Sequence, residues 1–251
     1  YLLIGIWGSG HKFYSAMKLT LMLMGGSALL MLGILGIYFN SSADGELTMN
    51  ILKIAENNAI PIEMQYLLFP LTFVGFGVLG AMFPFHTWSP DGHASAPTAV
   101  SMLHAGVLMK LGGYGCFRVA MYLMPQATVE LSWIFLILTG ISVVYGAFSA
   151  CVQTDLKYIN AYSSVSHCGL VLFALLMWNT TAMTGAVMQM LSHGLMTALF
   201  FALIGMIYGR THTRDVRELS GLMKIMPFLA VCYVIAGLAN LGFPGLIGFI
   251  A

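Results

Sequence analysis

The sequence predicts an all-α membrane protein, a polytopic bundle of helices that span a lipid bilayer. Three observations lead to this prediction: hydrophobic residues make up 59% of the chain, charged residues make up only 8%, and long apolar runs recur between short polar breaks. A soluble domain carries about 25% charged residues, so this chain has too few to cover a water-facing surface. The formal net charge of +1 gives no basic patch for nucleic acid. Lipid and other membrane subunits are therefore the expected partners.

Seven apolar runs are long enough to cross about 30 Å of hydrocarbon as helices. In chain order they occupy residues 14–38, 63–85, 98–117, 131–151, 159–177, 184–208 and 225–250. Helices are favoured over barrel strands because the runs lack period-two alternation, and because a helix satisfies its own backbone in lipid. Residues 2–7 are interpreted as the tail of one further helix. We expect residues 1–251 to form a single transmembrane domain, and to be a fragment, because the chain begins with Tyr and stops inside an apolar run.

Positively charged residues fall mostly on one side of the membrane if successive helices alternate in direction. The other side receives only Lys53 and Arg118. Because lysine and arginine are enriched in cytoplasmic loops, the first side is expected to face the cytoplasm of a bacterial-type plasma membrane. The residues on that side are Lys12, Lys18, Lys157, Arg210, Arg214, Arg217 and Lys224.

Gly75, Gly77 and Gly80 match the pattern G-x-G-x-x-G, which in another context indicates a dinucleotide site. That site needs a strand before the glycines and a helix opening after them, so that pyrophosphate meets a helix N-terminus. Here the pattern lies within an apolar membrane run. Close helix packing or local unwinding explains it better, and no cofactor, metal or catalytic site is expected on this chain.

Lys110 is the clearest anomaly, because it lies near the middle of the run 98–117 and too far from either end for easy snorkelling. An ionisable group at this depth costs about 3 kcal/mol or more unless it faces helices, water or a partner. His167 and His193 lie near the centres of their own runs, so three titratable groups share one depth. Burial lets a lysine exchange its proton near neutral pH, and imidazoles relay protons through either nitrogen. This pattern favours proton transfer.

The alternative is that these side chains only bond helices together. It stays open for His104 and for His167. It fits Lys110 less well, because a structural contact rarely needs a cation.

Proline and glycine interrupt two of the apolar runs, 63–85 and 225–250. The interrupting residues are Pro70 and Gly75–Gly80 in the first run, and Gly242, Pro244 and Gly245 in the second. A broken membrane helix must find partners for its freed backbone groups, so it tends to line a cavity. Two broken helices separated by intact ones indicate an inverted-repeat transporter with an ion site near the midplane. For either break alone, an ordinary proline kink is the alternative.

Four segments closely resemble the antiporter-like subunits of NADH:quinone oxidoreductase, respiratory complex I. They are FPFHTWSPDGHASAPTAVSMLHAGVLMKLGGYG (83–115), QTDLKYINAYSSVSHCG (153–169), SHGLMTALFFALIGMIYGRTHTRDVRELSGL (192–222) and LANLGFPGLIGF (238–249). The likeness covers nearly the whole chain. The segment YGRTHTRD at 208–215 looks like the subunit 4, or chain M, type. Cation/proton antiporter complexes and membrane-bound energy-converting hydrogenases carry relatives of the same fold.

The resemblance implies an antiporter-like fold of fourteen helices, with two inverted five-helix repeats, a broken helix in each and a polar axis at mid-membrane. This chain would run from the end of helix five into helix twelve, with 63–85 and 225–250 as the broken helices. Lys110 matches the helix-eight lysine of the axis, and His193 matches the central histidine of helix eleven. The predicted proton path comprises Lys110, His193, His167, His86 and His104, with Lys157 and His212 as accessory candidates.

Leu79 departs from the family pattern. Members commonly carry a lysine seven residues before the histidine of the PFH motif, and Leu79 stands at that place. Either the axis is organised differently, with Lys110 or His86 carrying more of the traffic, or this copy pumps less well. The first is favoured, because the surrounding GFGVLGAMFPFHTW is otherwise retained. The family's helix-five glutamate and its charged helix-twelve residue would lie just outside residues 1–251.

By this resemblance, the chain is expected to be a proton-translocating subunit of an NADH:quinone oxidoreductase, a translocase that couples electron transfer from NADH to quinone with proton pumping. It would carry no redox centre, and NAD, FMN, iron–sulfur clusters and quinone would bind elsewhere in the parent complex. Its partners would be other membrane subunits, including other antiporter-like ones, together with lipid and protons. The alternatives are a subunit of a cation/proton antiporter or energy-converting hydrogenase, and a structural subunit whose buried charges only fix packing.

Overall fold

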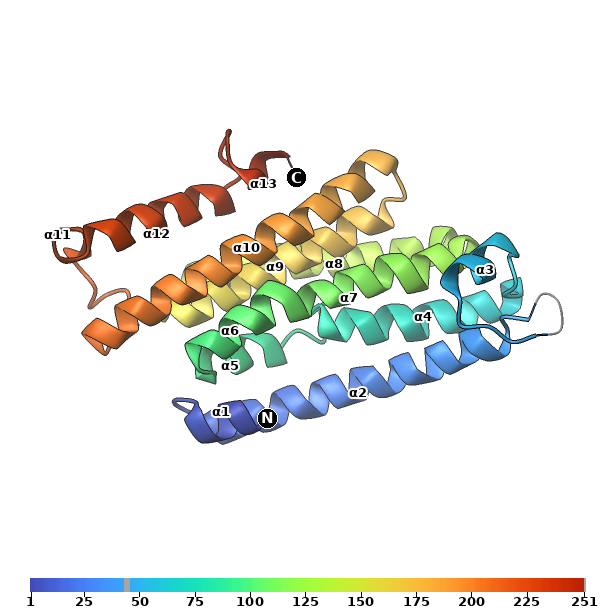
Figure 1. The fold of residues 1–251 in the computed structure, drawn as a ribbon, viewed down its shortest axis with the longest axis horizontal. Coiled ribbons are helices and arrows are strands. Elements are labelled where there is room, and N and C mark those ends of the chain that lie inside the picture. The colour runs from blue at the N-terminus through green and yellow to red at the C-terminus, as the bar shows by residue number, and fades with distance from the viewer. Residues whose placement is uncertain (43–45, 251) are drawn as a thin grey trace.

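The computed structural model describes residues 1–42 and 46–250. In these ranges the regular elements are all helices, and the only β-type pairing is an isolated bridge between Asp155 and Asp215. The helices lie side by side in an elongated bundle (Figure 1). The predicted all-α class is confirmed.

Five helices of the described part are long and apolar enough to span a membrane. They are α2 (Lys12–Phe39), α4 (Ile62–Leu79), α8 (Pro125–Val152), α9 (Leu156–Leu176) and α10 (Thr180–Thr211). The shorter helices are α1 (Leu2–Trp7), α3 (Ile51–Glu56), α5 (Trp88–Ser95), α6 (Thr98–Leu103), α7 (Met109–Gly115), α11 (Leu222–Ile225), α12 (Pro227–Asn240) and α13 (Ile247–Ile250).

Local sequence explains where several helices begin. The side chain of Asp155 caps α9 by accepting a hydrogen bond from the backbone of Lys157, and Asn179 caps α10 in the same way. Pro125 and Pro227 begin α8 and α12, at the position where a missing backbone N–H costs nothing. The short connections between α8, α9 and α10 make these neighbours antiparallel (Figure 1).

The first broken helix is present, but its break lies later than predicted. Helix α4 continues through Pro70 and ends at Leu79, and the chain resumes a helix only at α5, after residues 80–87. The prediction that Pro70 interrupts the run is wrong, because a membrane helix absorbs the single backbone bond that proline removes. Gly75 lies inside α4 and serves close packing, since a Cβ there would lie 2.9 Å from the Cβ of Leu30 in α2.

The second broken helix is confirmed where it was predicted. Helix α12 ends at Asn240 and α13 begins at Ile247. Between them Gly242 and Gly245 have φ of +69° and +91°, a region that side chains other than glycine rarely adopt. The chain therefore makes a non-helical turn there.

The run predicted at 98–117 forms a helical path interrupted by two π turns. These are η1 (His104–Leu108), between α6 and α7, and η2 (Cys116–Met121), after α7. π turns are rare and occur frequently at functional sites. Lys110 lies on the short α-helical stretch between the two.

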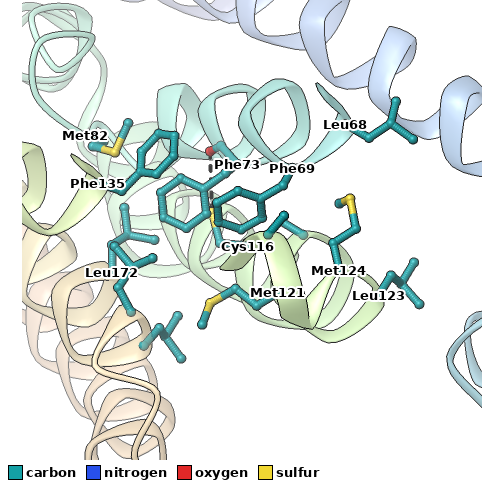
Figure 2. Close-up of a cluster of buried hydrophobic side chains, with 14 of the residues drawn as sticks. Leu68, Phe69, Phe73, Met82, Cys116, Met121, Leu123, Met124, Phe135 and Leu172 are labelled. Carbon is teal, nitrogen blue, oxygen red and sulfur yellow. Dashed lines mark hydrogen bonds between the residues drawn. The ribbon is translucent and has the colours of Figure 1, made fainter. Parts of the chain in front are cut away.

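An apolar cluster holds α4 against its neighbours at the α3 end of the bundle. Figure 2 shows the rings of Phe69 and Phe73 from α4 meeting that of Phe135 from α8. The ring centres of Phe73 and Phe135 are 4.6 Å apart, and those of Phe69 and Phe135 are 5.6 Å apart in an edge-on arrangement. This packing holds α4 against α8.

The two ends of the bundle differ in charge. In Figure 1, α1, α11 and the C-terminal end of α10 lie at one end, and α3 lies at the other. The first end, called the cationic end below, carries the residues Lys12, Lys18, Lys157, Arg210, Arg214, Arg217 and Lys224. Lys53 in α3 and Arg118 in η2 lie toward the opposite end. This separation agrees with the predicted alternation of the helices.

Candidate proton path

Lys110 is held by its own helix. Its amine donates a hydrogen bond to the carbonyl of Ala105, which lies in the π turn η1. A π turn shifts backbone hydrogen bonding from the fourth to the fifth residue, which changes the pairing of carbonyls around it. Across residues 1–42 and 46–250, no carboxylate forms an ion pair with Lys110. The amine is therefore not neutralised by a fixed counter-ion in this part of the protein.

A small cavity separates Lys110 from His193. Its volume is about 10 Å³, and its walls include Gly80, Cys168 and Met190. A space of this size holds about one water molecule. Gly80 is the first residue after α4, so the first helix break reaches this cavity.

Gly112 allows the end of α4 to approach α7 closely. A Cβ at this position would lie 2.5 Å from the backbone nitrogen of Gly80 and 2.7 Å from the carbonyl oxygen of Phe76. Only glycine therefore lets α7 contact the end of α4 directly, two residues after Lys110.

His193 and His167 form a stacked pair. Their ring centres are 4.8 Å apart and the His193 side chain is buried. Neither ring nitrogen of His193 has a hydrogen-bond partner within the described ranges. Buried polar atoms are normally satisfied, so two open nitrogens on one ring indicate a site for water or for an exchanging proton.

His167 has a partner at each ring nitrogen. The amide of Gln189 donates to Nδ1 at 3.0 Å, and Nε2 donates to the side-chain oxygen of Asn240 at 2.6 Å. These bonds select the neutral tautomer that carries its proton on Nε2. Asn240 is the last residue of α12, so the second helix break reaches His167.

A wider cavity opens at this second break. It has a volume of about 410 Å³, and His167, Gln189, Ser192, Asn240 and Gly242 are among its lining residues. A cavity of this size has room for several waters, and the side chains of His167, Gln189 and Asn240 offer them hydrogen-bond partners within a largely apolar lining. The group formed by Lys110, His193, His167 and Asn240, called the central file below, thus extends from the first helix break to a hydratable space at the second.

A second histidine pair lies on the α5 side of Lys110. The rings of His93 and His104 are 5.3 Å apart and edge-on, and His104 also meets the ring of Trp88. His93 is fully buried, and both of its nitrogens lack a partner in the part of the chain that the structure describes. His104 precedes Lys110 by six residues, which is about 9 Å along a helix.

Sequence reasoning missed His93. It lies in SPDGHASAP, a polar stretch that no apolar run includes, so its depth was not visible from hydropathy. The signal that could have found it is its place in the second half of the first broken helix, only four residues before Pro97.

Besides His104, three predicted site residues lie apart from the central file. His86 is buried in the loop after α4, against the rings of Phe83 and Tyr145. Lys157 lies in the first turn of α9 at the cationic end and donates to the carbonyl of Ala96 at 2.6 Å. His212 is exposed in the turn that ends α10. Their predicted roles stay predictions.

Ionic contacts anchor α5 at the cationic end, and sequence reasoning did not identify them. Lys18 of α2 lies 2.6 Å from a carboxylate oxygen of Asp91, and the hydroxyl of Tyr158 donates to the other oxygen at 3.1 Å. Arg214 donates to the carbonyl of Ala94 at 2.8 Å. These contacts fix the helix that carries His93.

The loop after α10 has an ion pair of its own, between Asp215 and Arg217. Arg217 donates to both carboxylate oxygens of Asp215, and these hydrogen bonds hold the pKa of Asp215 at about 2. This pKa lies below the ordinary value for aspartate. The stability that the Asp215–Arg217 pair contributes is therefore present above about pH 4 and is lost only as the pH falls through about 2.

Replacing Asn240 by leucine should release the His167 ring. The Nε2–H group loses its acceptor, which costs about 1 kcal/mol of stability and leaves the tautomer unselected. We expect a lower thermal midpoint for the full-length subunit and slower proton transport. Asn57→Leu, at the exposed end of α3, is the matched control. Equal transport in the Asn240 and Asn57 variants would show that this bond does not serve the path.

The chain has clear relatives. A family model described as NADH:quinone oxidoreductase/Mrp antiporter, transmembrane, matches residues 1–251. The NADH-quinone oxidoreductase subunit M of Rickettsia bellii is 38% identical over all of this chain and 50% of the relative. An NAD(P)H-quinone oxidoreductase chain 4 of Picosynechococcus is 41% identical over all of this chain and 45% of the relative.

Solved structures share the fold. Respiratory complex I from Thermus thermophilus with bound NADH contains a chain that matches 99% of this one, with a TM-score of 0.91 and 26% identity, over 52% of its own length. A chain of the Mrp complex from Dietzia matches 95% of this one at 21% identity, over 43% of its own length, with a TM-score of 0.83. At that identity the likeness concerns the fold alone.

The chain spans about half the length of the curated relatives it matches. The match to the family model nevertheless covers every residue of the chain. The resemblance predicted from the sequence is confirmed, as are the integral, multi-pass membrane fold and its discontinuous helices. The chain belongs to the transmembrane family of NADH:quinone oxidoreductases and Mrp antiporters.

Proposed function

We propose that this chain is the central part of a proton-translocating membrane subunit of an NADH:quinone oxidoreductase, of the subunit M or chain 4 type. The subunit would take part in coupling electron transfer from NADH to quinone with proton pumping. The observation that carries the proposal is the central file, in which a half-buried lysine and two stacked histidines join two helix breaks. Relatives 38% and 41% identical, named as quinone oxidoreductase subunits, support this reaction class.

In this proposal the central file moves protons through small displacements. The Lys110 amine releases a proton to water in the small cavity, and an open nitrogen of His193 receives it. His193 then gives up the proton it received to Nδ1 of His167, and His167 releases its Nε2 proton toward the cavity at the second break. Because Gln189 occupies Nδ1, its amide must turn away first, so Gln189 acts as a gate.

The parent complex would supply everything that this chain lacks. NAD, FMN, iron–sulfur clusters and quinone would bind to other subunits, and this chain would contact other membrane subunits, including antiporter-like ones. In a bacterial plasma membrane, the cationic end would face the cytoplasm, as the positive-inside rule requires. Lys12, Lys157, Arg210, Arg214 and Arg217 lie at that end.

A subunit of a cation/proton antiporter is the second candidate, favoured by the family's inclusion of Mrp antiporters. The two candidate functions can be distinguished by assaying proton transport in membrane vesicles from strains with and without the full-length gene. The first proposal expects NADH-driven acidification to be lost with the gene and restored by the gene on a plasmid. Acidification that does not depend on the gene, together with gene-dependent sodium/proton exchange, would support the antiporter instead.

His93→Phe tests whether the path extends to α5. Phenylalanine retains the ring volume next to His104 and removes two buried nitrogens that lack partners, so assembly should be unchanged or improved. We expect proton pumping to fall about tenfold or more if His93 relays protons. His11→Gln, on the exposed turn before α2, controls for the loss of a histidine. Pumping equal to that of the control would exclude His93 from the path.

A further inference from the structure

A groove lies between the last turns of α10 and the segment formed by α11 and the start of α12. It has a volume of about 550 Å³, which is within the range of small-molecule sites. Arg210 is the only charged residue that lines it. The rest of the lining includes Leu203, Met206, Gly209, Ile225, Phe228 and Leu229. We call it the α10–α12 groove.

The course of the chain explains why the groove exists. Pro227 starts α12 and cannot extend that helix backward, so the chain bends at Met226, whose side chain is buried. Figure 1 shows α11 beyond this bend, at the cationic end of the bundle. The bend holds α11 away from α10 and leaves an apolar space open between them.

The rim of the groove is strongly apolar. Phe228 is 82% exposed and Ile225 is 75% exposed. Apolar side chains that project together from a protein surface mark a contact with a partner or with lipid. These apolar side chains lie next to the Arg210 cation. A purely hydrophobic partner would leave that cation without a counter-ion.

Arg210 in the groove wall and Lys224 beside the groove have no partner among the described residues. Neither the Arg210 guanidinium nor the Lys224 amine, one residue before Ile225, takes part in a hydrogen bond or an ion pair there. Arg214 and Arg217, on the neighbouring loop, are each paired with a carboxylate. The groove therefore combines an apolar floor with one unpaired cation in its wall, Arg210, and a second, Lys224, one residue from its lining, at the end of the bundle.

We propose that the α10–α12 groove binds an anionic glycerophospholipid. One acyl chain lies along Leu203, Met206 and Leu229, and the phosphate is held by Arg210 and Lys224. The guanidinium presents paired donors to phosphate oxygens, and lysine adds a point charge. The position of the groove agrees with a bound phospholipid, because it lies at the end of the bundle, at the level where lipid headgroups would be. This inference rests on the membrane location and does not depend on the proton path.

The test uses the full-length subunit in vesicles that contain equal amounts of phosphatidylglycerol and phosphatidylcholine. Lipids that remain bound after extraction are identified by native mass spectrometry. We expect phosphatidylglycerol to be retained over phosphatidylcholine by about tenfold or more. Arg210→Gln combined with Lys224→Gln should abolish this preference, whereas Lys53→Gln, at the opposite end, should leave it unchanged.

Gly209→Phe tests the groove without changing its charge. A Cβ at Gly209 meets no atom within 4 Å, so the new side chain fits into the groove and takes the place of the acyl chain. We expect this variant to lose both lipids. Equal retention of the two lipids by the unmodified protein, or the same retention in the Gly209 variant, would overturn the proposal. So would an unchanged preference in the double variant.

Discussion

Replacing Lys110 by methionine is expected to abolish proton pumping while the subunit still assembles. Methionine retains the length and apolar stem of the lysine, and the loss is confined to an amine that bonds only to the Ala105 carbonyl in the described structure. Lys110 and His193 are the two basic side chains among the described residues that line the small cavity, so the amine is placed to hand a proton to His193 across it. We expect pumping by the intact complex to fall by about tenfold or more. It is measured as NADH-driven acidification of vesicles.

Lys110→Arg distinguishes proton exchange from a fixed charge. Arginine carries the same charge but is not deprotonated in proteins. A pumping Arg variant would therefore contradict an exchanging lysine and assign Lys110 a purely electrostatic role. Lys53→Met, on the exposed helix α3, controls for the loss of one lysine. Normal pumping by an assembled Lys110→Met complex would leave the structural hypothesis as the remaining explanation.

Gly112→Ala should be strongly damaging for a change of one methyl group. The alanine Cβ would lie 2.5 Å from the backbone nitrogen of Gly80. Because the contact is with backbone, it can be relieved only if α7 and the end of α4 move apart. The overlap should cost about 1–3 kcal/mol and separate α7 from the end of α4. We expect a lower thermal midpoint and reduced pumping together, because the same contact closes one wall of the Lys110 cavity.

Gly140→Ala is the matched control for this packing prediction. Its Cβ would lie 3.8 Å from the ring of Phe173, an ordinary contact, so the exchange should be neutral or slightly stabilising. Equal thermal midpoints for the Gly112 and Gly140 variants would show that the approach of α4 to α7 is not tight. Thermal unfolding of the full-length subunit in detergent measures both.

Hydropathy predicted the membrane helices well because their lipid-facing surfaces leave long apolar runs. It located Lys110, His167 and His193 at one depth for the same reason, and the structure brings these three together. It could not indicate that the partners of His167 would be two amides. Gln189 and Asn240 are uncharged and do not stand out in an apolar run, and Asn240 acts only because α12 ends there.

The position of the first break was harder to predict than that of the second. Around Gly242 and Gly245 the backbone needs positive φ, so composition and conformation agree. In α4, glycines serve helix contact instead, and Gly75 and Gly77 remain helical. Composition alone cannot distinguish a glycine that bends a chain from one that admits a neighbour.

The two π turns set the direction in which α7 presents its side chains. Each turn holds one residue more than an α-helical turn would, so the residues beyond it face about 100° away from where an uninterrupted α-helix would place them. Lys110 and the Tyr114 phenol are the ionisable side chains on the stretch between the turns. The two extra residues therefore decide which neighbouring helices the lysine faces.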